Sequence, residues 1–252
     1  MEAASLEEYR DAFARIEREV DAGNTDLAGL GFWRLVTKVK LDPLLSERWA
    51  DVVGRIDRAA FQRRVRPRFP VWLGNAVLLA GTAVLVAVVP VAVAVARRSA
   101  SPDPAVAGLL ALVAAGGLSV TTHDLAHWAA GRMAGIRFVG YFLDGPFRIQ
   151  PGLKTDYATY LRAPPRSRAG MHAAGAVASK VAPFAVFGAV YLPHRAAGFA
   201  LFPSWALWAI LGVGVVEILT DVVWSTKRSD WRKVRRERAV ARAVEHPPPP
   251  TG

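Results

Sequence analysis

Residues 71–96 read VWLGNAVLLAGTAVLVAVVPVAVAVA and contain no ionisable side chain. A helix of about 20 mostly apolar residues is long enough to cross the hydrocarbon layer of a bilayer, so this stretch predicts a membrane span. Three further apolar stretches follow, at about residues 104–131, 169–192 and 199–225. We therefore expect an all-α membrane protein with about four transmembrane helices.

The regions on either side of this apolar block are polar. Residues 1–68 predict a small helical region, in which Asp42-Pro43 has the N-cap and first-turn residues that begin a helix. Residues 69–226 form the predicted transmembrane domain, and residues 227–252 form a basic helix with a proline-rich tail. Between the second and third spans, Asp144-Gly145 separates two β-branched and aromatic runs, which predicts a β-hairpin in this loop.

The basic residues alternate from one side of the predicted spans to the other. The net charge is +11, yet the connection after the first span holds only Arg97 and Arg98, and the connection after the third holds only Arg195. Lys and Arg favour cytoplasmic loops, so we expect a multi-pass protein of the cell membrane with both termini in the cytoplasm. This distribution explains the charge without a nucleic-acid partner, and it predicts contact between the basic flanks and anionic lipid headgroups.

A metal-binding pattern lies at the end of the second span, SVTTHDLAHWAAGRMAG (residues 119–135). His123 and His127 are four residues apart, so a helix presents both imidazoles on one face, with Asp124 between them. The chain has no cysteine, which leaves His, Asp and Glu as ligands. Two histidines around an acid are typical of zinc hydrolases, so we predict one Zn²⁺ per chain with Asp124 as the catalytic acid–base group.

A catalytic zinc site needs a third protein ligand, and the fourth span offers Asp221. At 1.5 Å per residue, Asp221 and His127 each lie roughly 6 Å from the cytoplasmic ends of their helices, so they can meet at one level. Asp144 is the competing ligand, but its place before Gly145 favours a turn. Asp230 lies beyond the span, where we expect an interfacial cap or a salt-bridge partner.

Residues 104–226 resemble the site-2 protease family of intramembrane zinc metalloproteases. The likeness rests on HDLAHWAAGRMAGIRF (residues 123–138), on AAGAVASKVAPF (residues 173–184), where the family has Gly-Pro-x-x-Asn, and on Asp221 as the late transmembrane Asp. The resemblance implies hydrolysis of a peptide bond in or near a transmembrane segment of a membrane-protein substrate. It also implies that the substrate is locally unwound into an extended strand.

The chain departs from that family at three places. Asp124 replaces the family's Glu, Ser179 replaces an amide that supports the oxyanion, and Asp221 lacks the family's Leu-Asp-Gly context. Lys180 and Glu217 lie at a similar depth near mid-membrane, which predicts an ion pair or, for Lys180, a role in polarising a carbonyl; Glu217 is also an alternative base. These departures leave open a catalytically inactive metal-binding relative that binds membrane partners. A di-iron oxidase would need more histidines than the five present, and a metal transporter is the weakest alternative.

The charge pattern makes a testable prediction about topology. Reporter fusions placed after Arg97 and after Arg195 should both report the outside of the cell, because each connection holds few basic residues. A fusion at the C-terminus is the control and should report the cytoplasm. A cytoplasmic signal at either arginine would contradict the four-span topology.

Overall fold

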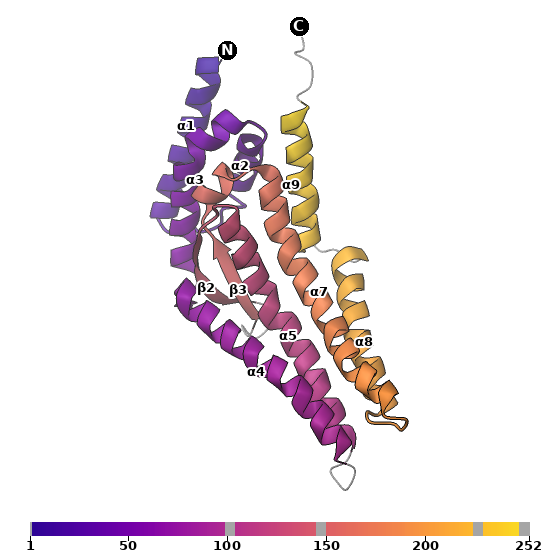
Figure 1. Cartoon of the computed structure of the whole chain (residues 1–252). Helices are drawn as coiled ribbons and strands as arrows, with labels where there is room; N and C mark the ends of the chain where they lie inside the picture. Colours follow the sequence, from indigo (N-terminus) through magenta and orange to yellow (C-terminus); the bar gives the residue numbers. More distant parts are fainter. Residues whose placement is uncertain (1, 99–103, 145–149, 224–228, 247–252) are drawn as a thin grey trace. The chain divides into compact units, whose positions relative to one another are not determined.

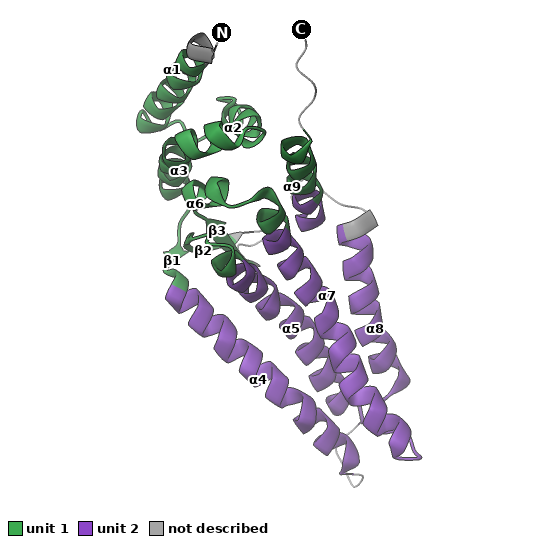
Figure 2. Cartoon of the chain, turned by 45° about the horizontal axis from the view of Figure 1, so that its top comes forward, with its two compact units in different colours: residues 1–71, 131–169, 235–252 green, residues 72–130, 170–234 purple. Residues whose placement is uncertain are grey.

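The computed structural model describes residues 2–98, 104–144, 150–223 and 229–246 (Figure 1). The chain divides into two compact units, which are coloured separately in Figure 2. Unit 1 comprises residues 1–71, 131–169 and 235–252, and unit 2 comprises residues 72–130 and 170–234.

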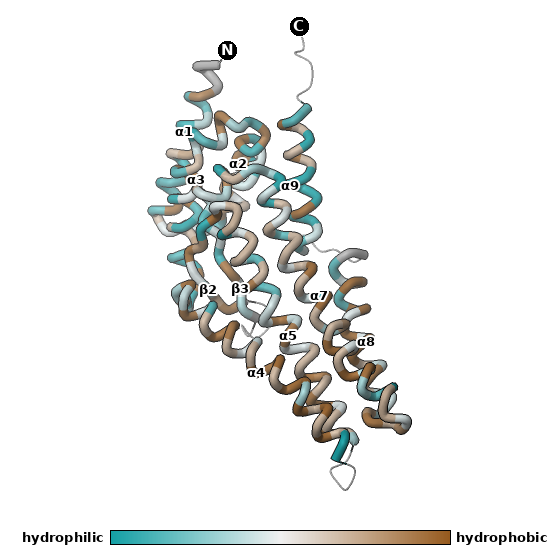
Figure 3. Tube along the Cα trace, in the orientation of Figure 1, coloured by the Kyte–Doolittle hydropathy of each residue, from teal (hydrophilic) through white to brown (hydrophobic). Residues whose placement is uncertain are grey.

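Unit 2 is built mainly from long apolar helices. These are α4 (Val71–Arg97), α5 (Pro104–Met133), α7 (Pro165–Ala196) and α8 (Ser204–Ile218), and α8 continues into a π-helical turn, η2 (Leu219–Val223). Among the described residues, four helices have the length and composition to cross a membrane. Figure 3 shows long apolar stretches along these helices. The prediction of an all-α membrane protein with about four transmembrane helices is confirmed.

The interior of unit 2 is lined by small side chains. Ala107, Ala111, Ala114 and Ala115 are fully buried on α5, while large residues of α4 such as Val84 stay more than half exposed. In lipid, burying apolar side chains between helices gives no hydrophobic free energy, because the lipid tails are equally apolar. Membrane helices therefore associate through small residues that let their backbones approach closely. The exposed apolar surface of α4 is therefore the surface expected to face lipid.

Unit 1 is built from helices that carry many polar side chains and from a small sheet. The helices are α1 (Glu2–Asp21), α2 (Phe32–Lys40), α3 (Pro43–Arg64) and α6 (Tyr157–Arg162), and the first residues of α3 are capped by the Asp42 carboxylate, as the sequence predicts. The strands are β1 (Arg68–Phe69), β2 (Phe138–Asp144) and β3 (Gln150–Thr155). They form an antiparallel sheet in the order β1-β2-β3. The predicted strands on either side of the hairpin are thus present, whereas Gly145, in the predicted turn, lies outside the described residues.

The loop between α5 and α7 belongs to unit 1, although the sequence assigned it to the transmembrane domain. Leu161 of α6 shares a buried core with Phe13 and Val53. Lys154 of β3 donates a hydrogen bond of 2.7 Å to Asp57 of α3. The loop therefore packs on the N-terminal helices, and sequence order alone does not reveal this grouping.

The part of helix α9 (Asp230–Glu245) that belongs to unit 1, from Arg235 onward, contains a buried carboxylate. Glu237 accepts hydrogen bonds from Lys40 Nζ and Arg168 Nε, both at 2.6 Å, and from the Tyr160 hydroxyl at 3.0 Å. Burial would raise the pKa of Glu237, but the cations Lys40 and Arg168 outweigh it and hold that pKa below its ordinary value. Glu237 is thus a charged anchor for the helix that begins at Asp230.

We predict that Glu237→Ala lowers the free energy of unfolding by about 3–5 kcal/mol, because it leaves the buried Arg168 guanidinium without its carboxylate. Thermal unfolding in detergent would measure the loss. The matched control is Glu245→Ala on the same helix, which removes the pair with the exposed Arg166 and should change stability little. Equal effects of the two substitutions would contradict an anchoring role for Glu237.

Candidate metal centre

The two histidines of α5 lie one turn apart and both face α7. His123 Nδ1 lies 3.1 Å from the carbonyl oxygen of Gly175, and His127 Nδ1 lies 2.8 Å from that of Met171. Gly175 and Met171 are also four residues apart, so one turn of α5 lies against one turn of α7 and each histidine meets its own carbonyl. A carbonyl oxygen can only accept, so each Nδ1 carries the hydrogen.

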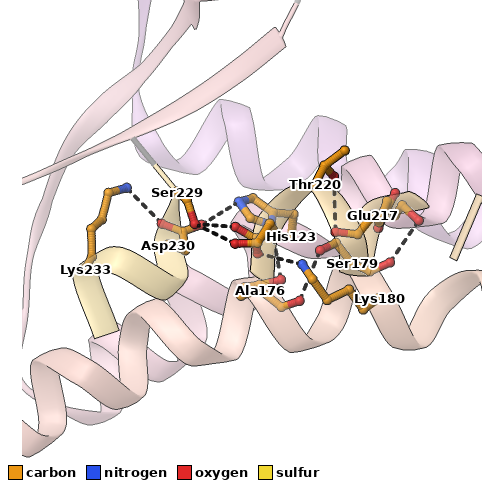
Figure 4. A network of polar contacts seen from close by, with 12 residues as sticks. His123, Ala176, Ser179, Lys180, Glu217, Thr220, Ser229, Asp230 and Lys233 are labelled. Carbon is orange, nitrogen blue, oxygen red and sulfur yellow. Dashed lines mark hydrogen bonds and ion pairs between the residues drawn. The ribbon is translucent and has the colours of Figure 1, made fainter. Parts of the chain in front are cut away.

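The opposite ring nitrogens converge on a single carboxylate. The Nε2 atoms of His123 and His127 lie 3.3 and 3.0 Å from Oδ2 of Asp230. One ligand atom from each of the three residues lies within 4.8 Å of the other two. Figure 4 shows Asp230 directed toward His123. The three residues therefore form a group that could hold a metal ion, and all three lie in unit 2.

The spacing and chemistry of this group fit a metal. Ligand atoms at about 2.0–2.1 Å from a tetrahedral zinc lie about 3.3 Å from one another, close to the separations between the imidazoles and Asp230. Hydrogen bonds from Nδ1 to backbone carbonyls fix the tautomer that leaves Nε2 for the ion, as is usual for metal-binding histidines. His127 and Asp230 are buried, and the His123 side chain keeps 34% of its surface exposed. That exposed edge gives access to the group.

Two further basic residues flank Asp230. Lys233 donates a hydrogen bond of 2.8 Å to Oδ1, and His172 Nδ1 lies 3.8 Å from the same oxygen. Burial would raise the pKa of Asp230, but its contacts with the two imidazoles and with the Lys233 ammonium outweigh burial and hold that pKa well below its usual range. The carboxylate is therefore ionised and oriented, with Oδ1 held by Lys233 and Oδ2 directed at the histidines.

Asp124 lies beside the histidines on α5. Its side chain is buried, and its Oδ2 atom has no hydrogen-bond partner within the part of the chain that the structure describes. A buried carboxylate oxygen without a donor is costly and is normally explained by a functional partner. Asp124 thus offers an acceptor next to the metal group that no described residue satisfies.

Gly175 makes room for the His127 ring. A Cβ atom at Gly175 would lie 2.6 Å from His127 Cε1 and still closer to Cδ2 and Nε2. Any side chain at this position would displace the imidazole, and the Gly175 carbonyl is also the partner of His123. Gly175 therefore supports both histidines, a role that the sequence pattern around it does not reveal.

The predicted third ligand, Asp221, is not part of this group. Its carboxylate lies in η2, where it accepts hydrogen bonds from Lys180 Nζ at 2.7 Å and from Ser229 Oγ at 2.5 Å. Depth along a helix sets the level of a side chain but not its direction around the helix axis, and here that direction is toward Lys180. Asp230, the first residue of α9, is instead the acid that faces the histidines. One sequence signal could have pointed to Asp230. It is an acidic residue only a few residues beyond the end of the fourth predicted span, on the side of the membrane where the span that carries His127 is also predicted to end.

The other predicted site residues have separate surroundings. Ser179 donates a hydrogen bond to the Ala176 carbonyl of its own helix, at 3.3 Å. Lys180 pairs with Asp221 rather than with Glu217, its expected partner. Glu217 Oε2 is buried without a hydrogen-bond partner among the described residues. Asp144 ends β2, and its side chain lies outside the described part of the structure.

Comparisons with protein-family models, with curated protein sequences and with solved structures return no match to this chain.

We predict that Gly175→Ala lowers the affinity for zinc by at least about 10–100-fold, because the added methyl group displaces His127. This is the loss usually seen when a contact that orients a metal ligand is removed. Zinc titration against a chromophoric chelator would measure it. The control is Gly188→Ala on the same helix, where the added Cβ meets no atom within 4 Å. Unchanged affinity in Gly175→Ala would contradict the placement of His127.

Proposed function

We propose that this protein is an intramembrane zinc metalloprotease, of the kind that the HDLAH motif resembles. The observation that carries the proposal is the convergence of two imidazole Nε2 atoms on Asp230, with both Nδ1 atoms fixed by carbonyls of α7. The helices that supply these groups have the length and composition to cross a membrane. Ionisable groups in such segments are costly and are usually retained for function.

The ligand set of two imidazoles and one carboxylate favours zinc. It is the His₂-carboxylate set of zinc hydrolases, which leaves one coordination position open. His123, His127 and Asp230 would hold the ion, with one Zn²⁺ per chain. Zinc bound there would supply Lewis-acid activation of a water molecule and of the scissile carbonyl.

Asp124 is the group that moves the proton. Its Oδ2 atom, which no residue in the described part of the chain donates to, is an acceptor beside His123 and His127. A carboxylate in this position takes a proton from the attacking water and returns it to the leaving amine. The neighbouring histidines cannot take this role while their Nδ1 hydrogens are held by Gly175 and Met171 and their Nε2 atoms serve as ligands.

The substrate class follows from the location of the group among apolar helices. A membrane-embedded or membrane-proximal peptide segment can approach through lipid, whereas a folded soluble protein cannot. In the proposed orientation both termini face the cytoplasm of the cell membrane. The exposed arginines of α9, such as Arg232 and Arg238, would then meet anionic lipid headgroups.

A metal-binding relative without protease activity is the second candidate. The observation that favours it is the side chain of Asp124, which is one methylene shorter than the Glu of the resembled family. Proton transfer needs hydrogen-bond distance, so a shorter acid can fall out of reach of the water. Such a protein would keep the metal group and use it to hold the helices for a membrane partner.

We predict that Asp124→Asn keeps its zinc but lowers the cleavage rate by about 10²–10⁴-fold, the usual worth of a general base. Asp124→Glu should keep zinc and keep or raise the rate. The assay co-expresses each variant with single-span reporter proteins that carry a cytoplasmic tag, and it measures the tag released. His123→Ala is the control that loses both metal and cleavage.

Two outcomes would contradict this assignment. If the natural chain and Asp124→Asn both release no tag while Asp124→Glu does, the natural protein is a metal-binding relative and not a protease. If Asp124→Asn cleaves as fast as the natural chain, another group is the base, and Glu217 is the next acid to replace.

A further inference from the structure

A second polar cluster lies close to the metal group, at the junction of α7, η2 and the start of α9. Asp221 of η2 accepts a hydrogen bond from Lys180 of α7 at 2.7 Å. The Ser229 hydroxyl lies 2.5 Å from the other carboxylate oxygen of Asp221 and 3.2 Å from the Asp221 carbonyl oxygen. Figure 4 shows Lys180, Ser229 and Asp230 in one continuous polar network.

Ser229 links this cluster to the metal group, because it is next to Asp230 in the chain. Ser229 directly precedes Asp230, the first residue of α9 and the carboxylate that faces the histidines. A hydrogen bond to Ser229 therefore fixes the backbone from which Asp230 projects. Without it, Ser229 would have more conformational freedom directly before the carboxylate.

The ion pair keeps Asp221 in place. The side chains of Lys180 and Asp221 are only 12% and 19% exposed. Removing either side chain would leave the other charge buried without its partner, which destabilises the fold. Lys180 thus holds one carboxylate oxygen of Asp221, and the other oxygen accepts the hydrogen bond from Ser229.

We propose that Lys180, Asp221 and Ser229 are positioning residues that orient Asp230 toward the two histidines. The inference rests on the proposed metal site and gives a role to Asp221 and Lys180, neither of which belongs to the metal group. Contacts that orient metal ligands affect affinity and geometry without touching the ion. The network acts on the metal through Asp230 alone.

The test uses Co²⁺ in place of Zn²⁺, because the visible spectrum of Co²⁺ reports the geometry of its ligands. Ser229→Ala removes the hydroxyl and keeps the ion pair. We expect its metal affinity to fall about 10–100-fold, with an altered Co²⁺ spectrum. Ser229→Thr restores the hydroxyl and should restore both readouts. The matched control is Thr220→Ala, whose hydroxyl bonds the Val216 carbonyl of its own helix at 2.8 Å.

A second variant guards against misfolding. Replacing Lys180 with Met and Asp221 with Leu together substitutes apolar groups for the ion pair, an exchange that proteins often tolerate. This variant should lose affinity as Ser229→Ala does. Adding Ser229→Ala to it should cause little further loss, because the bond to the Asp221 carboxylate is already absent and only the longer contact with the Asp221 carbonyl remains.

Natural affinity and an unchanged spectrum in Ser229→Ala would overturn the positioning role while leaving the metal site standing. Retained metal in His123→Ala and Asp230→Ala would instead overturn the metal site, and the positioning role with it. Equal losses in Thr220→Ala and Ser229→Ala would show a general loss of stability and would also overturn the positioning role.

Discussion

The matched pairs of hydrogen bonds between α5 and α7 are the contacts on which the metal group depends. His123 and His127 are one turn apart on α5, and their acceptors, Gly175 and Met171, are one turn apart on α7. Inside a bundle of apolar helices there is little water, so a polar N–H group must find its acceptor within the protein. The carbonyl oxygens of Gly175 and Met171 are the acceptors for the two imidazole N–H groups. The two bonds set the register of the helices and present both Nε2 atoms on the same side.

Close approach of the helices is a condition for this arrangement. Gly175 offers no side chain where the His127 ring lies, and the buried alanines of α5 keep the rest of the interface narrow. Small residues are the usual means by which membrane helices approach each other, and here the same feature creates space for an imidazole. Packing and metal binding are thus served by one set of residues.

The third member of the group, Asp230, is the first residue of α9. Glu237 holds α9 within unit 1 by bonds to Lys40, Arg168 and Tyr160. In unit 2, the first residue of the same helix, Asp230, faces the histidines, and Ser229 just before it bonds Asp221. In the proposed protease, Asp230 would complete a site whose base, Asp124, already lies on α5. The carboxylate that completes the group is therefore supplied from outside the apolar helices and held there by polar contacts.

The sequence by itself determined the membrane helices, the helix that begins after Asp42, and the pairing of His123 with His127. These are local properties, because apolar length and a spacing of four residues fix a span and a helical face without knowledge of the rest of the chain. Only the tertiary structure decided that Asp230 meets the histidines, that Asp221 meets Lys180, and that the loop carrying Leu161 joins the N-terminal helices. Each of these depends on the direction of a side chain around its helix axis or on the path of a connecting segment, and residue spacing along one helix constrains neither.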